Sequence, residues 1–336
     1  MNQLQEVKKI RKILSAALII TLIITALLFL FYHNKSDYTS VFFSLDTVVS
    51  VSLSEDFTDE VRETVNDLSE TFDNYNENSE ISLLNRKKKL TCSKDLSELI
   101  RQTENLRGLY GKSVNISTGR LTKLWNESLG KGSIPKESDV MRYINDTSDD
   151  NIIISENTIT LLNDITIEPG AVAKGYVLDK LMDLCKKHDP ENAIISLGSS
   201  TLLYSSEKSK SFNVAIKADR ESIAGTTETQ KNFVSTSGDY ERFTEIDGKK
   251  YHHIIDPKTG FPSETGLSSV TVFCDSGIAS DFLSTLIFIE GKENLQKHLS
   301  SDIYEIVAID TDGNIYHSNS LKFTANKPKG ANVCEN

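Results

Sequence analysis

Three short segments combine residue types that suit phosphate and metal chemistry. The first, residues 168–176 (EPGAVAKGY), places small residues and Lys174 where a helix is expected to begin after a strand. The free N–H groups and the dipole at a helix N-terminus attract anions, and a lysine adds positive charge. The segment therefore predicts a phosphate-binding turn, although a glycine-containing turn before a helix is more often only a turn.

The second segment, residues 280–285 (SDFLST), is predicted to start a short helix capped by Ser280. Asp281, Ser284 and Thr285 stand at positions i, i+3 and i+4, so they share one helix face. A carboxylate and hydroxyls suit Mg²⁺, which keeps several waters and takes further ligands from substrate phosphate. The alternative is that these side chains only cap the helix.

The third segment, residues 251–262 (YHHIIDPKTGFP), is predicted to be a strand end followed by a tight turn. His253 titrates near neutral pH and is a candidate acid or base. His252 should point to the opposite face of the strand. The alternative for His253 is an ordinary exposed or hydrogen-bonded histidine.

Hairpins and helices must position these segments. The hydrophobic pattern predicts one strand at 41–54, helices at 59–76, 93–109 and 173–187, and hairpins that turn at Glu156-Asn157 and at Asp247-Gly248. Further strands are predicted at 192–198, 211–218, 231–238 and 268–274. This order favours an α+β fold over a regularly alternating parallel sheet. One catalytic domain at 41–326, followed by a polar tail at 327–336, is the simplest partition.

The composition narrows the class of protein. The chain has 336 residues, of which 38% are hydrophobic, so it can bury a substantial core. A formal net charge of -11 argues against nucleic-acid binding, which depends on clustered Lys and Arg. The four cysteines are far apart and form no CxxC pair, so the sequence suggests neither a zinc site nor a thioredoxin-like motif, and a disulfide between two of them stays open.

The amino terminus predicts a membrane anchor. Residues 13–32 are apolar and uncharged, which is the length a helix needs to cross a bilayer. Lys8, Lys9, Arg11 and Lys12 precede this run, so residues 1–12 are expected in the cytosol, with a linker at 33–40 and the domain outside the cell membrane. The alternative is a cleaved signal peptide, but the run ends in the bulky residues LFLFY rather than in a small-residue cleavage site.

Taken together, these motifs resemble the ApbE family of flavin transferases. The resemblance covers nearly all of the region after the predicted anchor. It rests on residues 45–47 (LDT), 72–75 (FDNY), 78–81 (NSEI), 84–85 (LN), 114–119 (VNISTG), 124–125 (LW), 168–176, 196–198 (SLG), 235–242 (STSGDYER), 253–262 (HIIDPKTGFP) and 281–285.

The resemblance implies an ApbE-like domain of mixed or antiparallel sheets and packed helices. It also implies a Mg²⁺-dependent FAD:protein FMN transferase, which moves FMN from FAD to a Ser or Thr hydroxyl of an extracytoplasmic acceptor protein and releases AMP. His253 and Asp281 become the expected catalytic residues. The expected metal ligands are Asp281, Thr285 and the backbone carbonyl of Ala171, with Ser284 nearby. The expected FAD contacts are Leu45, Tyr75, Ser113, Val114, Asn115, Glu168, Lys174 and Ile255.

Two motifs depart from the family pattern. Residues 168–171 (EPGA) stand where the family usually has Asp-Leu-Gly-Gly, and residues 197–200 (LGSS) stand where it has Leu-Gly-Gly-Asp. The departures affect the expected FAD geometry more than the fold. Two other functions remain open: an FAD pyrophosphatase that gives FMN and AMP, and a surface protein that binds flavin without turnover.

Overall fold

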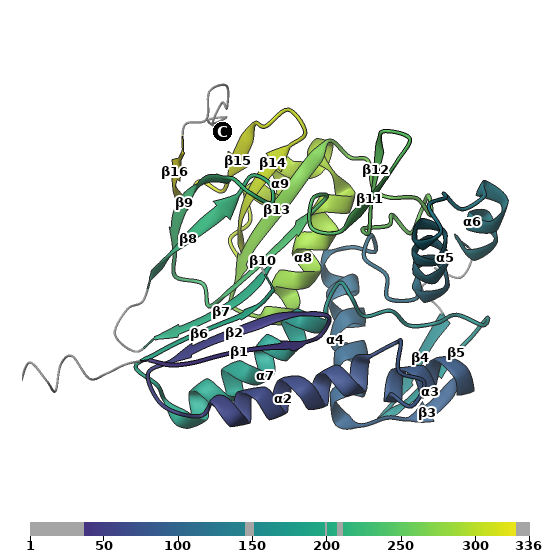
Figure 1. The fold of residues 1–336 in the computed structure, drawn as a ribbon, viewed down its shortest axis with the longest axis horizontal. Helices are drawn as coiled ribbons and strands as arrows, with labels where there is room; N and C mark the ends of the chain where they lie inside the picture. Colours follow the sequence, from purple (N-terminus) through teal and green to yellow (C-terminus); the bar gives the residue numbers. More distant parts are fainter. Residues whose placement is uncertain (1–36, 145–150, 199, 207–210, 327–336) are drawn as a thin grey trace, which may run out of the picture.

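A computed structural model describes residues 37–144, 151–198, 200–206 and 211–326. Its centre is an eight-stranded sheet with the order β1-β2-β6-β7-β10-β13-β14-β15, in which all neighbours pair antiparallel (Figure 1). The strands are β1 (Tyr38–Ser44), β2 (Thr47–Leu53), β6 (Asn192–Leu197), β7 (Thr201–Ser206), β10 (Phe233–Gly238), β13 (Leu267–Cys274), β14 (Glu305–Asp310) and β15 (Ile315–His317). The α+β prediction is confirmed.

Helices cover one face of this sheet and enclose the main core. They include α2 (Thr58–Phe72), α4 (Lys94–Tyr110), α7 (Ala173–His188) and α8 (Gly277–Glu290). The sequence of α8 is apolar almost throughout, and the helix is buried along nearly its whole length. Asp281 is therefore a carboxylate inside a core helix, a position that costs free energy unless the charge is compensated.

A second, smaller sheet lies on part of the other face. It consists of β8 (Phe212–Lys217), β9 (Ile223–Thr229) and β16 (Lys322–Ala325), and it packs on β10, β13 and β14 through a separate apolar cluster that includes Ile216, Val234, Phe273 and Val307. On the same face of the large sheet, Val41, Phe43 and Val48 of β1 and β2 remain exposed. One half of the molecule thus has three layers and the other has two.

The remaining elements lie around these layers. They are α3 (Glu80–Lys87), α5 (Gly119–Gly130), α6 (Glu137–Ile144) and α9 (Leu295–Leu299), the short helix η3 (Lys292–Asn294), the sheet β3-β5-β4 (Lys89–Thr91, Thr158–Leu161, Ile152–Ser155) and the hairpin β11 (Phe243–Ile246) with β12 (Lys249–His252). The predicted hairpin turns at Glu156-Asn157 and Asp247-Gly248 are confirmed. A third apolar cluster, centred on Trp125, joins α5 and α6 to the segment after β12.

The predicted single strand at 41–54 is wrong. The segment forms the hairpin of β1 and β2, because Leu45 and Asp46 both adopt positive φ values, 53° and 55°, and reverse the chain in two residues. The predicted helix at 59–76 ends earlier, at Phe72.

Two other predictions concern regions that the structure does not describe. The proposed anchor at 13–32 and the tail at 327–336 both lie outside the described residues. None of the described helices is both long enough and apolar enough to cross a membrane. Cys92, Cys185 and Cys274 are buried free thiols.

Candidate functional site

Helices α7 and α8 cross at two glycines, and this crossing places Asp281 beside the start of α7. A Cβ atom on Gly175 would lie 2.2 Å from the carbonyl oxygen of Gly277, and a Cβ on Gly277 would lie 2.3 Å from that of Gly175. Only glycine permits so close an approach of two backbones. The approach lets the Gly175 N–H donate a hydrogen bond of 3.0 Å to Asp281 Oδ2.

Asp281 is an incompletely satisfied carboxylate. Its residue is 5% exposed. Burial raises its pKa, whereas the charge of Lys174, the Gly175 N–H and the charge of Arg242 act in the opposite direction. Its second oxygen, Oδ1, accepts no hydrogen bond from the described residues. A buried carboxylate with a free oxygen between two cationic side chains is suited to bind a further positive group.

The Ala171 carbonyl has a similarly open position. In a regular helix the Gly175 N–H would donate to this carbonyl four residues earlier, but it donates to Asp281 instead. No backbone N–H of the described residues bonds the Ala171 oxygen. The Ala171 side chain packs against the core, so this departure from the family pattern does not fill the space before α7.

The hydroxyls of α8 face β10. Ser284 and Thr285 both lie within hydrogen-bond distance of Ser237 Oγ, at 2.9 and 3.0 Å. Ser284 is fully buried and also donates to the Asp281 carbonyl, whereas Thr285 is half-buried. The Ser284 hydroxyl is thus used in helix–sheet packing, whereas Thr285 remains partly exposed to solvent.

These oxygens form a mixed donor set. The part of the chain that the structure describes contains no group of three or more His, Cys, Asp or Glu side chains able to hold a metal. Carboxylate, hydroxyl and carbonyl oxygens at incomplete number nevertheless fit Mg²⁺, which retains waters and shares substrate phosphate. Asp281, Thr285 and Ala171 therefore fit the expected ion.

The predicted cap of this helix is wrong. Helix α8 begins at Gly277, and Ser276 caps it by accepting a hydrogen bond from the Ala279 N–H. Asp179 of α7 accepts hydrogen bonds from Gly277 N and Ile278 N at 2.6 and 2.8 Å. This second cap comes from a distant segment, which local sequence does not reveal. Ser280 instead lies buried and bonds Ser235 of β10 at 2.8 Å.

Two basic side chains, Lys174 and Arg242, act on the Asp281 carboxylate. Lys174 Nζ donates to Ser200 Oγ at 2.6 Å, so Ser200 takes part in the site. The Arg242 guanidinium is exposed and has no hydrogen-bond or ion-pair partner among the described residues, although its charge acts on Asp281, Glu168 and His253. This cationic end of the site is suited to bind a diphosphate.

His253 is held as a neutral imidazole. Burial and then the charge of Arg242 lower its pKa to about 3, so the ring is uncharged at neutral pH. Nδ1 lies 3.1 Å from the Arg242 carbonyl, which only accepts, so Nδ1 carries the proton and Nε2 keeps a free lone pair. His252, by contrast, is buried, bonds the Ser263 carbonyl at 2.9 Å and packs edge-on against Phe288. The two histidines thus occupy different environments, and His253 lies just after the end of β12.

Glu168 is anchored by two asparagines. Asn74 Nδ2 donates to Glu168 Oε2 at 2.8 Å, and Asn85 Nδ2 donates to Asn74 Oδ1 at 2.9 Å. Burial raises the pKa of Glu168, while the Asn74 hydrogen bond, the Gly170 N–H and Arg242 lower it. Asn74 and Asn85 lay in the recognised motifs but had no predicted role.

The other predicted FAD contacts come from four segments of the chain. Ser113, Val114 and Asn115 are buried in a loop whose continuation bonds the Glu168 segment, through Glu168 N to the Ile116 carbonyl at 2.7 Å. Leu45 lies in the β1–β2 turn, next to Asp46, whose charge acts on Glu168. Tyr75 is 75% exposed. Ile255 packs in the cluster around Trp125.

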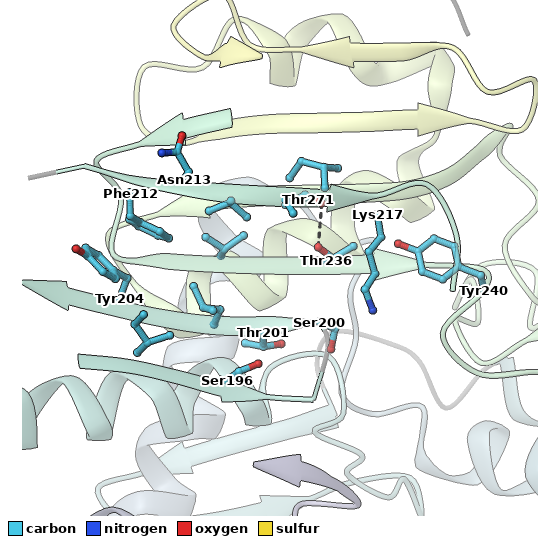
Figure 2. A pocket seen from close by; sticks show the side chains of 16 residues that line it. Ser196, Ser200, Thr201, Tyr204, Phe212, Asn213, Lys217, Thr236, Tyr240 and Thr271 are labelled. Atoms are coloured by element: carbon cyan, nitrogen blue, oxygen red, sulfur yellow. Dashed lines mark hydrogen bonds between the residues drawn. The ribbon is translucent and has the colours of Figure 1, made fainter. Parts of the chain in front are cut away.

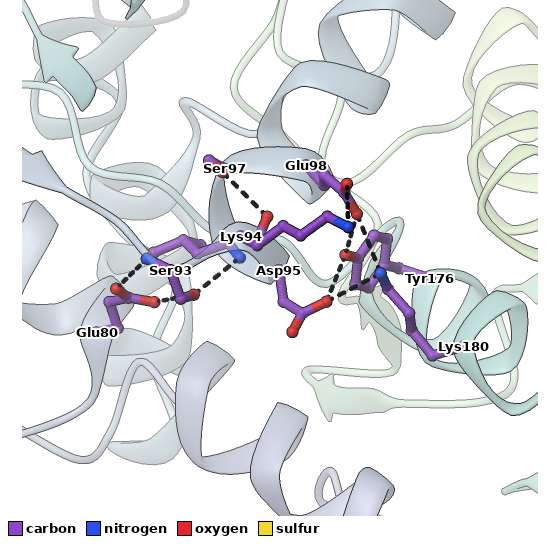
Figure 3. A network of polar contacts seen from close by, with 9 residues as sticks. Glu80, Ser93, Lys94, Asp95, Ser97, Glu98, Tyr176 and Lys180 are labelled. Atoms are coloured by element: carbon purple, nitrogen blue, oxygen red, sulfur yellow. Dashed lines mark hydrogen bonds and ion pairs between the residues drawn. The ribbon is translucent and has the colours of Figure 1, made fainter. Parts of the chain in front are cut away.

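A polar network fixes the first turns of α7 against α4 (Figure 3). The Tyr176 hydroxyl donates to Asp95 at 2.9 Å, and Lys180 pairs with Asp95 and Glu98 at 3.0 Å each. At the other end of the network, Glu80 accepts hydrogen bonds from the backbone and side chain of Ser93. Because Tyr176 lies two residues after Lys174, the network also fixes the position of that lysine.

Comparison with known proteins identifies one family and several relatives. The model of the ApbE family matches residues 45–309. A FAD:protein FMN transferase of Klebsiella pneumoniae (strain 342) is 30% identical over 210 residues, which cover 61% of this chain and 65% of that protein. One of Treponema pallidum (strain Nichols) is 30% identical over 203 residues, covering 54% and 56%. The match therefore spans less than two thirds of these two relatives.

Longer matches and solved structures agree with this result. A FAD:protein FMN transferase of Vibrio cholerae is 26% identical over 277 residues, covering 79% of this chain and 82% of that protein. The ApbE protein of Thermotoga maritima has a similar fold, with a TM-score of 0.77 at 23% identity, covering 85% of this chain and 98% of that one. The flavin transferase ApbE from Vibrio cholerae has a TM-score of 0.73 at 20% identity, with the same coverage.

Proposed function

The chain belongs to the ApbE family, and on that premise we propose that it is a Mg²⁺-dependent FAD:protein FMN transferase. It would move FMN from FAD to a Ser or Thr hydroxyl of an extracytoplasmic protein and release AMP. The observation that supports this most is the free oxygen of buried Asp281 between Lys174 and Arg242. A protein that only carries flavin needs no such charge arrangement around a phosphorus atom.

The proposed metal site consists of Asp281 Oδ1, Thr285 Oγ1 and the Ala171 carbonyl. Both Asp281 Oδ1 and the Ala171 carbonyl lack a hydrogen-bond donor among the described residues, which supports their role as ligands. Mg²⁺ bound there would offset negative charge on the diphosphate and on the departing AMP.

Lys174 and Arg242 would bind the diphosphate of FAD. Lys174 is fixed from one side by Ser200 and along its helix by the Tyr176 network. Leu45, Tyr75, Ser113, Val114, Asn115, Glu168 and Ile255 would contact the rest of FAD. The anchored Glu168 carboxyl supports this assignment, since a half-buried acid held by an asparagine pair is positioned for a specific polar contact.

His253 would accept the proton of the attacking hydroxyl. The acceptor oxygen forms a bond to the FMN phosphorus, the bond from that phosphorus to the bridging oxygen breaks, and AMP leaves with the electron pair. The free lone pair on Nε2 supports the role of base, and the negative diphosphate favours protonation of the ring during the reaction.

Replacing His253 with Ala is expected to slow the chemical step by roughly a hundred-fold or more while FAD still binds, because a positioned base is lost. Single-turnover transfer and FAD affinity, measured separately, test this. His252 is unsuitable as a silent control because it is buried against Phe288. His317→Ala, on the far edge strand β15, is a better control. Equal loss of FAD affinity and rate would assign His253 to binding instead.

We also propose that the protein is a single-pass membrane protein with residues 1–12 in the cytosol and residues 33–336 outside. The support is the uncharged run at 13–32 and the Lys and Arg residues before it. Protease added to intact cells should then remove the large domain. If the domain stays protected while another surface protein is cut, the proposed orientation is wrong.

The direct test of the activity uses FAD, Mg²⁺, the full-length protein in detergent and candidate surface proteins. The proposal predicts an acceptor whose mass increases by one FMN unit. The same mixture without FAD is the control.

A further inference from the structure

A cavity of about 340 Å³ lies on the face of the large sheet opposite α8, where β8 passes over β7 and β10 (Figure 2). This volume is within the range of ligand-binding pockets. None of the residues assigned to the metal or to FAD lines it. Ser200, which does line it, accepts the hydrogen bond from Lys174. The cavity therefore begins one hydrogen bond away from the proposed diphosphate site.

The cavity has a polar end and an aromatic end. At the polar end, the Lys217 ammonium extends toward Ser200 and the Tyr240 hydroxyl points inward (Figure 2). At the other end, the rings of Tyr204 and Phe212 stack with centroids 4.2 Å apart. An occupant must therefore combine an anionic group with an apolar part.

Two polar groups at the polar end lack partners. Lys217 Nζ makes no hydrogen bond or ion pair with the described residues. Tyr240 is only 4% exposed, and its hydroxyl lies near that of Ser269 without forming a hydrogen bond. A buried hydroxyl without a partner is costly, and a ligand oxygen would remove that cost. A carboxylate has acceptor oxygens for both of these donors.

One side of the cavity continues onto an uncovered surface. The register places Ile194 and Ser196 of β6, which line the cavity, beside Ser52 and Ser50 of β2. The same face continues to Phe43, Val41 and Val48, which are 71%, 69% and 51% exposed. This strip of exposed apolar side chains and serines extends beyond the cavity and is typical of a docking surface.

We propose that this strip and the adjoining cavity bind the acceptor protein, with an acidic side chain of the acceptor at Lys217. The inference rests on the proposed transferase function. Ser200 lines the cavity and accepts the hydrogen bond from Lys174, so an acceptor segment with its acidic side chain at Lys217 would have a neighbouring Ser or Thr close to the proposed diphosphate site. A bilayer surface fits less well, because the strip contains serines rather than the Lys and Arg residues that bind anionic lipids.

The test compares Lys217→Glu with Lys217→Met in the full-length protein, using the acceptor identified by FMN mass addition. The KM for the acceptor is expected to rise at least tenfold in Lys217→Glu and less in Lys217→Met. The affinity for FAD, measured without the acceptor, should stay unchanged. Lys322→Glu, at an exposed lysine of β16 in the same small sheet, is the matched control.

Two further changes, one in this protein and one in the acceptor, test the same docking surface. Phe43→Ser should also raise the acceptor KM, since it removes an exposed apolar contact without disturbing the core. Changing the contacting acidic residue of the acceptor to Lys should restore transfer by Lys217→Glu. Unchanged acceptor KM in both Lys217→Glu and Phe43→Ser would overturn the docking proposal, and would leave a bilayer or a second copy as the occupant of the strip. FAD binding with no FMN on any protein would instead refute the transferase function itself.

Discussion

Replacing Asp281 with Asn is expected to abolish FMN transfer while the domain still folds. The amide oxygen keeps the hydrogen bond from the Gly175 N–H, and loss of the buried charge removes a desolvation cost. The proposed site, however, loses its only carboxylate ligand. Because metal stabilisation of a phosphoryl-transfer transition state amounts to several kcal/mol, the rate should fall by about a thousand-fold or more.

Transfer rates over a range of Mg²⁺ concentrations, together with melting curves, provide the measurement. Thr285→Val should have a weaker effect, because one neutral ligand is replaced in a shell that also contains water. Unchanged turnover of Asp281→Asn at limiting Mg²⁺ would contradict the metal assignment.

Replacing Gly175 with Ala should reduce both stability and transfer. The added methyl group would lie 2.2 Å from the Gly277 carbonyl oxygen and 2.8 Å from Asp281 Cβ, and the first of these contacts is with backbone. Helices α7 and α8 must therefore separate. We expect a loss of about 1–3 kcal/mol in the free energy of unfolding, as for other overpacked cores, and a displaced Asp281.

Gly108 provides a matched control. It lies inside helix α4, and an added Cβ would meet nothing within 4 Å. Gly108→Ala should therefore leave transfer unchanged and raise the free energy of unfolding by up to about 1 kcal/mol. Denaturant unfolding of both variants gives the comparison. A Gly175→Ala protein as stable and as active as the parent would disprove the close helix crossing.

Local sequence rules predicted much of the fold. The helix that became α7, and the hairpin turns at Glu156-Asn157 and Asp247-Gly248, follow from hydrophobic spacing and turn chemistry within a few residues. The β1–β2 turn was missed, because neither Leu45 nor Asp46 is a glycine and Leu rarely adopts positive φ. The order of the strands depends on pairings between distant segments, which spacing along the chain does not contain.

In the site, too, local sequence predicted some residues, whereas others depend on contacts between distant segments. Residue type and spacing made Lys174, His253 and Asp281 candidates, and the family resemblance gave them their expected roles. The structure connects them through their electrostatic interactions. The roles of Gly175 and Gly277 were not predicted, because the two glycines are about a hundred residues apart in the sequence and meet only in the fold. The role of Arg242 was not predicted either, because only the fold brings its charge close enough to act on Asp281. The predicted cap of α8 at Ser280 was wrong for the same reason, because Asp179 of the distant helix α7 takes part in the actual cap.

The central claim is that FMN leaves FAD for a protein hydroxyl. The most direct measurement follows a single reaction of full-length protein, FAD, Mg²⁺ and acceptor, and quantifies AMP, free FMN and FMN bound to protein. The account predicts equal amounts of AMP and protein-bound FMN, little free FMN, and loss of both products with Asp281→Asn. Equal amounts of AMP and free FMN with an unlabelled acceptor would identify a pyrophosphatase, and FAD binding without any AMP would identify a flavin-binding protein; either result would contradict the account.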